Sequence, residues 1–206
     1  INSFDRSGFE RHARGFDPSD TTASLKGKRI AVTGANSGIG FATAAAVVQR
    51  GGDVVLLCRN RVRGEQARAS LKSLSDGRVD LVVVDVADLA SVTEASQRLG
   101  DEPLYALVHN AGVLPDQRLE SPQGHELTVA THVLGPHLLT AVCRARLAAA
   151  RHPRVIWVSS GGMYPVRLTR RDVQWRQRKY DGVAAYAQTK RMQVVLAQCW
   201  AERLAT

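Results

Sequence analysis

Apolar residues fall into short runs that recur along the chain from Lys28 onward. Within each run the hydrophobic side chains occupy successive positions rather than alternate ones, which indicates strands buried on both faces. The runs lie at residues 28–34, 54–58, 79–85, 104–110 and 154–160. Strands of this kind are typical of a parallel sheet that helices cover on both sides.

The segments between these runs have the spacing of amphipathic or alanine-rich helices. The predicted helices occupy residues 37–50, 63–74, 88–99, 126–150 and 183–204. Because strand–helix–strand crossovers are right-handed, the alternation predicts an α/β fold, namely a Rossmann-type, doubly wound parallel sheet in three α/β/α layers. The sequence contains no internal repeat and no low-complexity tract.

The start of the chain does not share this alternation. It carries Phe4, Phe9 and Phe16 among charged and small polar residues. We therefore expect residues 1–24 to form an N-terminal arm that packs against another surface. The alternating pattern assigns residues 25–206 to one folded domain.

The chain is strongly basic, with a formal net charge of +9 and a pI near 10.1. Its arginines are spread along the sequence instead of forming one patch, so we expect no nucleic-acid binding. A basic protein of an organelle, or one that binds acidic partner subunits, fits the charge equally well. No apolar run approaches the ~20 residues that a membrane-spanning helix needs, so no transmembrane segment is expected.

Cysteine and histidine spacing does not favour a metal site. The three cysteines, Cys58, Cys143 and Cys199, lie far apart and are expected to be reduced thiols packed as small apolar groups. The chain begins at Ile1 rather than Met, which indicates processing or trimming, and residues 1–24 contain no signal-peptide core. We expect an intracellular protein, with the mitochondrion, the cytoplasm and a membrane surface as alternative locations.

A glycine-rich stretch, TGANSGIG, lies where the first predicted strand gives way to the first predicted helix. Gly34 allows a tight turn, Gly38 lets the backbone approach a pyrophosphate, and Gly40 permits close packing of helix on strand. The helix N-terminus offers unpaired N–H groups and a partial positive charge to phosphates. The stretch predicts a dinucleotide site, against the alternative of a plain turn. The expected coenzyme-binding residues are Gly34, Asn36, Ser37, Gly38, Ile39 and Gly40.

The spacing T-G-x-x-x-G-x-G resembles that of the short-chain dehydrogenase/reductase family, and further resemblance extends over most of the chain. It implies that Asp85 and Val86, at the end of the third strand, contact the adenine. It also implies that the residues after the fourth strand, Asn110, Ala111 and Gly112, line the coenzyme site.

The end of the second strand bears on the choice of coenzyme. Cys58, Arg59 and Asn60 stand where an NAD-specific enzyme places Asp or Glu against the ribose hydroxyls. An arginine pairs bidentately with a phosphate, which a carboxylate would repel. We therefore expect Arg59 and Asn60 to contact the coenzyme, with NADP(H) preferred and NAD(H) as the alternative. The other interpretation is that Arg59 simply starts a solvated helix.

Tyr186 and Lys190 are four positions apart on a predicted helix and should share one face. No other tyrosine in the chain has a lysine four residues later. A nearby ammonium favours the phenolate form of a tyrosine and suits it to general acid–base work. By resemblance to the family, Tyr186 is the acid–base and Lys190 also binds the nicotinamide ribose. Ser160 would hydrogen-bond the substrate oxygen, with Ser159 as the alternate.

Two positions depart from the family pattern. His109 replaces the first asparagine of its NNAG element, and His132, three residues before Gly135, replaces the asparagine of its catalytic tetrad. In the family that asparagine holds a proton-relay water through a backbone kink. His132 is therefore a fourth candidate catalytic residue, whose imidazole either bridges water or substitutes poorly for the amide.

The segment between the catalytic serine and tyrosine is longer than in most of the family and resembles one subgroup of it. Residues 161–182 form a basic insertion, either a solvated flap or a dock for an acidic partner or substrate. The family continues with two more strands, which we expect this domain to lack. The strand at residues 154–160 would then be a long apolar edge strand.

These observations support two hypotheses of function. The first is an oxidoreductase that transfers hydride between NADP(H) and a small-molecule carbonyl or alcohol, with a lipophilic substrate as one option. The second is a weakly active or inactive accessory subunit of a larger assembly, with the mitochondrion as one candidate location. The chain is expected to form a homodimer or to join a larger complex.

Overall fold

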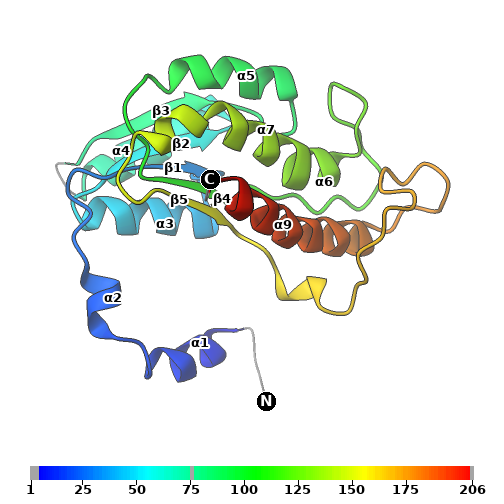
Figure 1. The fold of residues 1–206 in the computed structure, drawn as a ribbon, viewed down its shortest axis with the longest axis horizontal. Helices are drawn as coiled ribbons and strands as arrows, with labels where there is room; N and C mark the ends of the chain where they lie inside the picture. Colours follow the sequence, from blue (N-terminus) through cyan, green and yellow to red (C-terminus); the bar gives the residue numbers. More distant parts are fainter. Residues whose placement is uncertain (1–4, 75–76, 205–206) are drawn as a thin grey trace.

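The structure, a computed structural model, describes residues 5–74 and 77–204. Its centre is a five-stranded sheet in the order β3-β2-β1-β4-β5, in which every neighbouring pair is parallel. The strands are β1 (Arg29–Thr33), β2 (Asp53–Cys58), β3 (Val79–Val83), β4 (Ala106–His109) and β5 (Arg154–Trp157). The predicted Rossmann-type, doubly wound sheet is confirmed (Figure 1).

Helices cover both faces of the sheet (Figure 1). The apolar side chains of α3 (Gly38–Gln49) and α4 (Arg61–Lys72) pack on one face, and those of α5 (Leu89–Arg98) and α7 (Gly135–Val142) pack on the other. The long helix α9 (Gly182–Leu204) contacts β5. Three layers result, as the sequence predicts.

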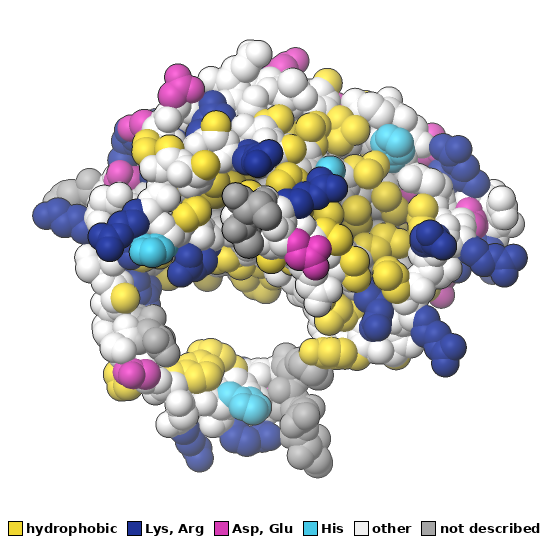
Figure 2. All heavy atoms as spheres, in the orientation of Figure 1, with side chains coloured by type: hydrophobic (Ala, Val, Ile, Leu, Met, Phe, Trp, Pro, Cys, Tyr) yellow, Lys and Arg dark blue, Asp and Glu magenta, His cyan; other side chains and the backbone are white. Residues whose placement is uncertain are grey.

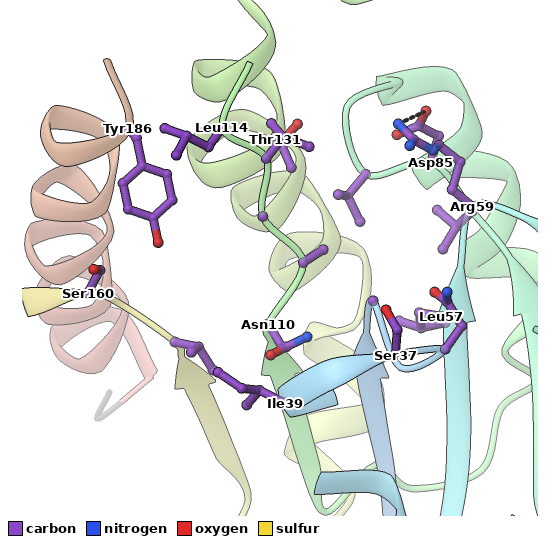
Figure 3. Close-up of a pocket in the computed structure, with 18 of the residues that line it drawn as sticks. Ser37, Ile39, Leu57, Arg59, Asp85, Asn110, Leu114, Thr131, Ser160 and Tyr186 are labelled. Atoms are coloured by element: carbon purple, nitrogen blue, oxygen red, sulfur yellow. Dashed lines mark ion pairs between the residues drawn. The ribbon is translucent and has the colours of Figure 1, made fainter. Parts of the chain in front are cut away.

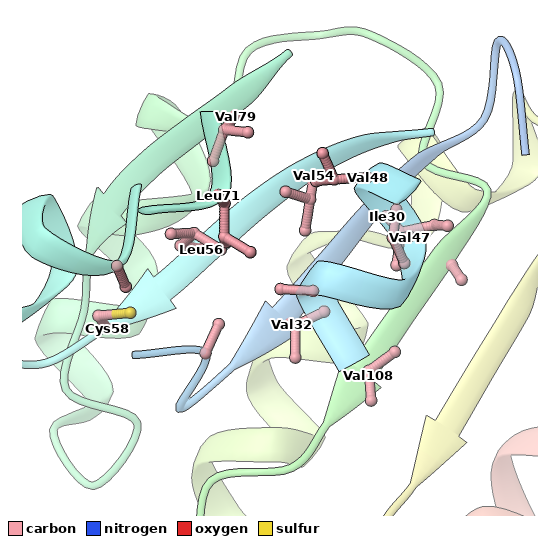
Figure 4. Packing of buried hydrophobic residues seen from close by; sticks show 14 residues of the cluster. Ile30, Val32, Val47, Val48, Val54, Leu56, Cys58, Leu71, Val79 and Val108 are labelled. Atoms are coloured by element: carbon pink, nitrogen blue, oxygen red, sulfur yellow. The ribbon is translucent and has the colours of Figure 1, made fainter. Parts of the chain in front are cut away.

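The alternation of side chains along β1 explains why its three central residues, Ile30, Ala31 and Val32, are all apolar. Ile30 and Val32 enter the core on the side of α3 and α4, which Figure 4 shows, whereas Ala31 enters the core on the other face. All five residues of this central strand are buried. Because helices cover both sides, the middle of the strand has no exposed face, and its polar residues, Arg29 and Thr33, stand at the two ends.

The order of the strands decides where a ligand can bind. From β1 the chain proceeds to β2 and β3 in one direction, and then returns to β4 and β5 on the other side of β1. The direction of winding therefore reverses between β1 and β4. In doubly wound sheets this switch point leaves a crevice outside the carboxyl ends of the strands.

The single helix predicted over residues 126–150 is wrong in one respect, because it is interrupted. The segment forms α6 (Leu127–Val129), the π-helical turn η1 (Ala130–Leu134), α7, and then α8 (Arg144–Ala148). Gly135 bonds through its N–H to the carbonyl of Ala130, five residues earlier. Pro136 follows and has no N–H for the carbonyl one turn before it, which favours this local widening.

The predicted edge strand is also shorter than expected. Figure 1 and the strand order place β5 at the edge of the described sheet, but it comprises four residues, Arg154–Trp157. Its burial is incomplete, and the side chain of Ile156 is 46 % exposed. A short edge strand presents fewer unpaired backbone groups than a long one.

The arm contains two short helices, α1 (Arg6–Ala13) and α2 (Pro18–Thr22), which extend away from the sheet (Figure 1). Phe9 and Phe16 pack edge to face with ring centroids 6.1 Å apart, and both are exposed. Phe4 lies outside the described residues. The surface that covers this aromatic pair stays a prediction. None of the described helices has the length and apolar character needed to cross a membrane.

The basic segment 161–182 is anchored at its centre. Trp175 is buried, and the guanidinium of Arg178 lies 3.6 Å from the centroid of its ring. Tyr180 donates to the carboxylate of buried Glu126 (3.2 Å), whose own N–H donates to the side chain of Gln174 (2.7 Å). Figure 2 shows Lys and Arg side chains at this end of the molecule. The exposed ones in the segment are Arg167, Arg170, Arg171, Arg176, Arg178 and Lys179.

Candidate active site

A pocket of about 690 Å³ opens at the carboxyl ends of the strands, at the switch point. The predicted residues that line it are Gly34, Asn36, Ser37, Ile39, Arg59, Asp85, Val86, Asn110, Ala111, Gly112, Ser160, Tyr186 and Lys190. In Figure 3 Tyr186 and Ser160 lie at one end of the pocket, and Arg59 and Asp85 lie at the other. Side chains from distant parts of the sequence thus share one crevice.

The remaining predicted residues lie outside the lining, and they are Gly38, Gly40, Asn60 and His132. Gly40 serves packing, because a Cβ there would collide with the main-chain oxygen of Gly34. Asn60 caps α4 by accepting the N–H of Arg63 (2.9 Å), which occupies its side-chain oxygen. These residues shape the pocket without facing into it.

The start of α3 suits a phosphate. Gly34, with φ of +66°, turns the chain from β1 toward the helix in a conformation that favours glycine. Ser37 then begins α3 without any side-chain cap, whereas Asn60 and Asp88 cap the starts of α4 and α5. The first N–H groups of α3 therefore have no side-chain acceptor, and they can donate to the phosphates of a dinucleotide.

Thr33 holds two strand ends together beside this turn. Its hydroxyl accepts the N–H groups of Asn110 and Ala111 (2.9 Å each), and the side-chain amide of Asn110 donates back to the Thr33 carbonyl (2.9 Å). Thr33 was not among the site residues predicted from the sequence. Its signal was a hydroxyl residue that ends a buried strand immediately before Gly34.

Two arginines, one after β2 and one in α4, line the pocket. Arg59 is largely exposed and forms a long ion pair with Asp85 (3.9 Å), drawn as a dashed line in Figure 3. Arg63, one turn into α4, lines the pocket as well and was missed. Arg63 could have been predicted because it follows Arg59 by four residues, about one helical turn. The prediction considered only the residues at the strand end. The pair concentrates positive charge at this end of the pocket.

The candidate chemical group occupies the other end. Tyr186 and Lys190 share one face of α9, with the ammonium 5.6 Å from the centroid of the phenol ring. Lys190 is buried and donates to the carbonyl of Val158 (2.8 Å). Burial lowers the pKa of its ammonium to about 8. The charge next to the phenol is therefore retained at neutral pH.

The two serines after β5 differ in what their hydroxyls do. Ser159 donates to the main-chain oxygen of Lys190 (2.8 Å) and so fastens α9 to the strand end. Ser160 accepts the N–H of Gly162 (3.2 Å), which leaves its hydroxyl proton available. Figure 3 shows the Tyr186 hydroxyl pointing into the pocket on the side of Ser160. This arrangement favours Ser160 over Ser159 as the donor to a substrate oxygen.

His132 lies behind the pocket wall instead of facing the cavity. Its side chain is fully buried, and burial lowers the pKa of the imidazole to about 3, with the charge of Lys190 acting in the same direction. One ring nitrogen accepts the N–H of Val113 (3.0 Å) and the other lies 2.7 Å from the hydroxyl of Thr189. Neither nitrogen is left to bind a water molecule.

The further residues of the lining are Leu57, Val84, Val113, Leu114, Thr131, Val158 and the alternate serine, Ser159. Leu57 and Val158 lie at the ends of strands, where ligands usually bind in this architecture. Only this position in the sequence could have predicted that they line the pocket. Within the described residues, no three His, Cys, Asp or Glu side chains gather as metal ligands do.

Comparison with known proteins identifies the family. A family profile described as short chain dehydrogenase matches residues 28–169. This chain belongs to the short-chain dehydrogenase/reductase family. The match includes the glycine turn and Ser160, while Tyr186 and Lys190 lie beyond its end.

Curated relatives extend the similarity over most of the chain. Human dehydrogenase/reductase SDR family member 12 is 36 % identical over 204 residues, which are 98 % of this chain and 64 % of that protein. Bovine dehydrogenase/reductase SDR family member 13 is 40 % identical over 190 residues, or 88 % of this chain and 49 % of the relative. The predicted resemblance to the family, and within it to the member 12 subgroup, is confirmed.

Solved structures share the fold. A protein from Mycobacterium paratuberculosis superposes with a TM-score of 0.80 at 29 % identity, covering 91 % of this chain and 66 % of its own. A short-chain dehydrogenase from Sphingobium yanoikuyae in complex with NADPH gives a TM-score of 0.69 at 23 % identity, covering 86 % and 66 %. This chain spans 64 % of the length of the human relative and 49 % of the bovine one.

Proposed function

We propose that this chain binds NADP(H) and that its pocket catalyses hydride transfer between that coenzyme and a lipophilic carbonyl or alcohol. The observation that carries the proposal is the shared crevice, in which Tyr186, Ser160 and Lys190 lie opposite the uncapped start of α3 and the arginine pair. The nicotinamide ring, when bound, supplies or accepts the hydride.

The preference for NADP(H) rests on Arg59 and Arg63. Both line the pocket beside the end of β2, and no carboxylate occupies the position that would repel a ribose phosphate. Asp85 pairs with Arg59 at the same end of the pocket, so a bound phosphate would compete with that carboxylate for the guanidinium. NAD(H) stays the alternative coenzyme.

In the proposed reaction the chain supplies a proton and a charge. Tyr186 donates its hydroxyl proton to the oxygen of a carbonyl that is being reduced, or takes one from an alcohol that is being oxidised. Ser160 donates a hydrogen bond to the same oxygen. Lys190 stabilises the phenolate that Tyr186 becomes, because its ammonium is held in a buried site where charges interact strongly.

The preference for lipophilic substrates rests on the apolar residues beside Tyr186. Val113 and Leu114 line the pocket on this side, and the side chain of Leu114 is 55 % exposed. Ile39 lines the floor and is 67 % exposed. An apolar substrate would remove these side chains from water, which contributes roughly 25 cal/mol for each Å² buried.

The test is NADPH oxidation by the purified chain with a panel of long-chain and short-chain aldehydes and ketones. We expect turnover that Tyr186→Phe lowers by at least about a hundredfold, the usual contribution of a general acid–base. Tyr105→Phe, which changes a tyrosine outside the pocket, is the matched control. Equal rates for Tyr186→Phe and the wild type would contradict the assignment.

Coenzyme choice has its own test. Arg59→Asp should weaken NADPH binding by at least about tenfold while NADH binding changes little, because the new carboxylate repels only the ribose phosphate. Arg170→Asp, on the exposed basic segment, makes the same change of charge away from the pocket. A wild-type chain that binds NADH and NADPH equally would discard the NADP(H) preference.

A second candidate function is that of an accessory subunit with little catalysis. The open edge of β5 with exposed Ile156, and the exposed Phe9–Phe16 pair on the arm, favour a chain that binds other proteins. No turnover with the whole carbonyl panel, combined with stable co-purification with partner chains, would support this function over the first.

A further inference from the structure

The hydrogen bonds of His132 define which of its nitrogens carries the proton. The N–H of Val113 can only donate, and it donates to Nε2 (3.0 Å), so Nε2 has no proton. A neutral imidazole must then carry its proton on Nδ1, which lies 2.7 Å from the hydroxyl oxygen of Thr189. The Thr189 hydroxyl in turn donates to the main-chain carbonyl of Ala185 or Tyr186 (3.0 and 2.9 Å).

The hydrogen bonds from Val113 through His132 to Thr189 form a series in which every donor points the same way. It starts at a backbone N–H and finishes at a backbone carbonyl, and neither of these groups exchanges protons during catalysis. Protonation of the ring would also set an Nε2–H against the N–H of Val113. The geometry therefore opposes a relay through the imidazole, independently of the low pKa that burial imposes.

The ring is also separated from the cavity. A Cβ built on Gly112 would lie 3.2 Å from Nε2 of His132 and 3.7 Å from Nζ of Lys190, so the backbone of Gly112 lies close to both groups. Gly112 itself lines the pocket, whereas His132 does not.

His132 does contact the candidate catalytic residues from behind. Its ring packs edge to face against the phenol of Tyr186, with centroids 5.4 Å apart and an interplanar angle of 86°. Through Thr189 it is bonded to α9, which carries Tyr186 and Lys190, and through Val113 it is bonded to the loop after β4. It thereby joins the two pieces of chain that form opposite sides of the catalytic end.

We propose that His132 and Thr189 are positioning residues, which form a clasp between α9 and the loop after β4, and that no proton passes through the imidazole. The clasp sets Tyr186 and Lys190 at a fixed distance from Gly112 and the nicotinamide end of the pocket. His132 thus occupies the position of the tetrad asparagine, where it links α9 to the loop after β4. The proposal rests on the proposed function, because it concerns the same site.

The decisive variant is Thr189→Val, which removes the hydroxyl and keeps the shape of the side chain. We expect kcat to fall about tenfold and NADPH affinity to fall several-fold, the effect of losing one hydrogen bond to a buried group. The pH dependence of kcat should keep its shape, since no titrating group in a proton path has been removed. Thr189→Ser, which keeps the hydroxyl, should restore most of the loss.

A matched control exists elsewhere in the core. Thr140 lies on α7, and its hydroxyl is 2.8 Å from Nε2 of buried His109, away from the pocket. Thr140→Val should lower stability as Thr189→Val does and leave kcat and NADPH affinity unchanged. Equal loss of kcat in the two valine variants would show that core damage alone explains the effect, and would overturn the proposal.

A measurement without turnover separates this proposal from the proposed function. The nitrogen-15 chemical shifts of His132 should report a proton on Nδ1, with no titration between pH 8 and about pH 5. A proton on Nε2, titration near neutrality, or a shifted pH profile in Thr189→Val would overturn the clasp even in an active enzyme. If the wild type turns over no carbonyl, the proposed function fails, and NADPH affinity and the nitrogen shifts still decide the clasp.

Discussion

Two buried histidine–threonine pairs occur in this chain, and they differ in how completely they are bonded. His109 bonds to Thr140 and His132 bonds to Thr189, and each threonine also donates to a carbonyl four residues earlier in its own helix. Burial lowers the pKa of both imidazoles to about 3. The residue types and the depth of burial are thus alike, although His109 bonds to its threonine through Nε2 and His132 through Nδ1.

The difference lies in the second nitrogen. Nδ1 of His109 has no hydrogen-bond partner among the described residues, and the ring packs at a tilt of 42° against Trp157 with centroids 4.3 Å apart. His132 has both nitrogens bonded and packs against Tyr186. The first pair fills the core beneath β4 and β5, whereas the second connects two walls of the site. The same chemical pair thus serves packing in one place and alignment in another.

Removing the imidazoles gives the largest expected contrast. His132→Ala should lower kcat about a hundredfold, since two hydrogen bonds are lost and each is equivalent to roughly a tenfold effect. His109→Ala should leave kcat within about threefold of the wild type, although both variants lower the free energy of unfolding by roughly 2–4 kcal/mol. Steady-state kinetics and urea unfolding followed by circular dichroism test this. Similar kcat values in the two variants would show that the two histidines do not differ in their effect on catalysis.

Acid should destabilise the protein through both pairs. Each imidazole has a folded-state pKa near 3, well below its ordinary value of 6.5, so the unfolded chain binds more protons between these limits. The stability is fully present above about pH 6.5 and is lost as pH falls toward 3. At pH 5 the loss is about 2 kcal/mol for each histidine. Urea unfolding at pH 7 and pH 5 measures it.

The variants His109→Gln and His132→Gln sharpen this result. Each should remove one histidine from the acid dependence, so that the difference in unfolding free energy between pH 7 and pH 5 falls by about half. A variant that keeps the full wild-type dependence would show that its imidazole is already charged, or already exposed, in the folded state.

An alkaline change of about tenfold is expected at Lys190, which lies beside the clasp. Burial sets the pKa of its ammonium at about 8, so the charge that supports Tyr186 is mostly present at pH 7 and mostly lost at pH 9. kcat should therefore decline about tenfold between these values. The same alkaline limb should persist in Thr140→Val. A pH-independent kcat across this range would contradict the role given to the ammonium.

The smallest effect is expected when a whole pair becomes apolar. His109→Leu combined with Thr140→Val removes the unpartnered nitrogen and should change the free energy of unfolding by no more than about 1 kcal/mol. His132→Leu combined with Thr189→Val strands the N–H of Val113 and should cost about 1–3 kcal/mol. Equal costs would mean that the two pairs are bonded alike in solution.

Much of the fold and part of the candidate site could be predicted because their causes are local. Consecutive apolar residues predict buried parallel strands, and the glycine at position 34 predicts the turn that begins the pocket. The four-residue spacing of Tyr186 and Lys190 predicts their common face on α9. Each of these inferences needs only neighbours within about one helical turn.

The errors and omissions involve contacts between distant residues. Whether His132 binds water or a threonine depended on Val113 and Thr189, which lie 19 and 57 positions away. The break in the predicted helix at residues 126–150 has two causes. Gly135 lies close to the carbonyl of Val86, and Pro136 follows it directly. Arg63 enters the pocket only because α4 packs beside the ends of β2 and β3.

The sequence by itself determined the order of strands and helices, the glycine turn and the pairing of a tyrosine with a lysine on one helix. These features follow from periodicity and backbone freedom, which are properties of short segments. Only the tertiary structure decided the charge state of Lys190 and the tautomer of His132. Both depend on burial and on hydrogen-bond partners that the folding of the whole sheet brings together.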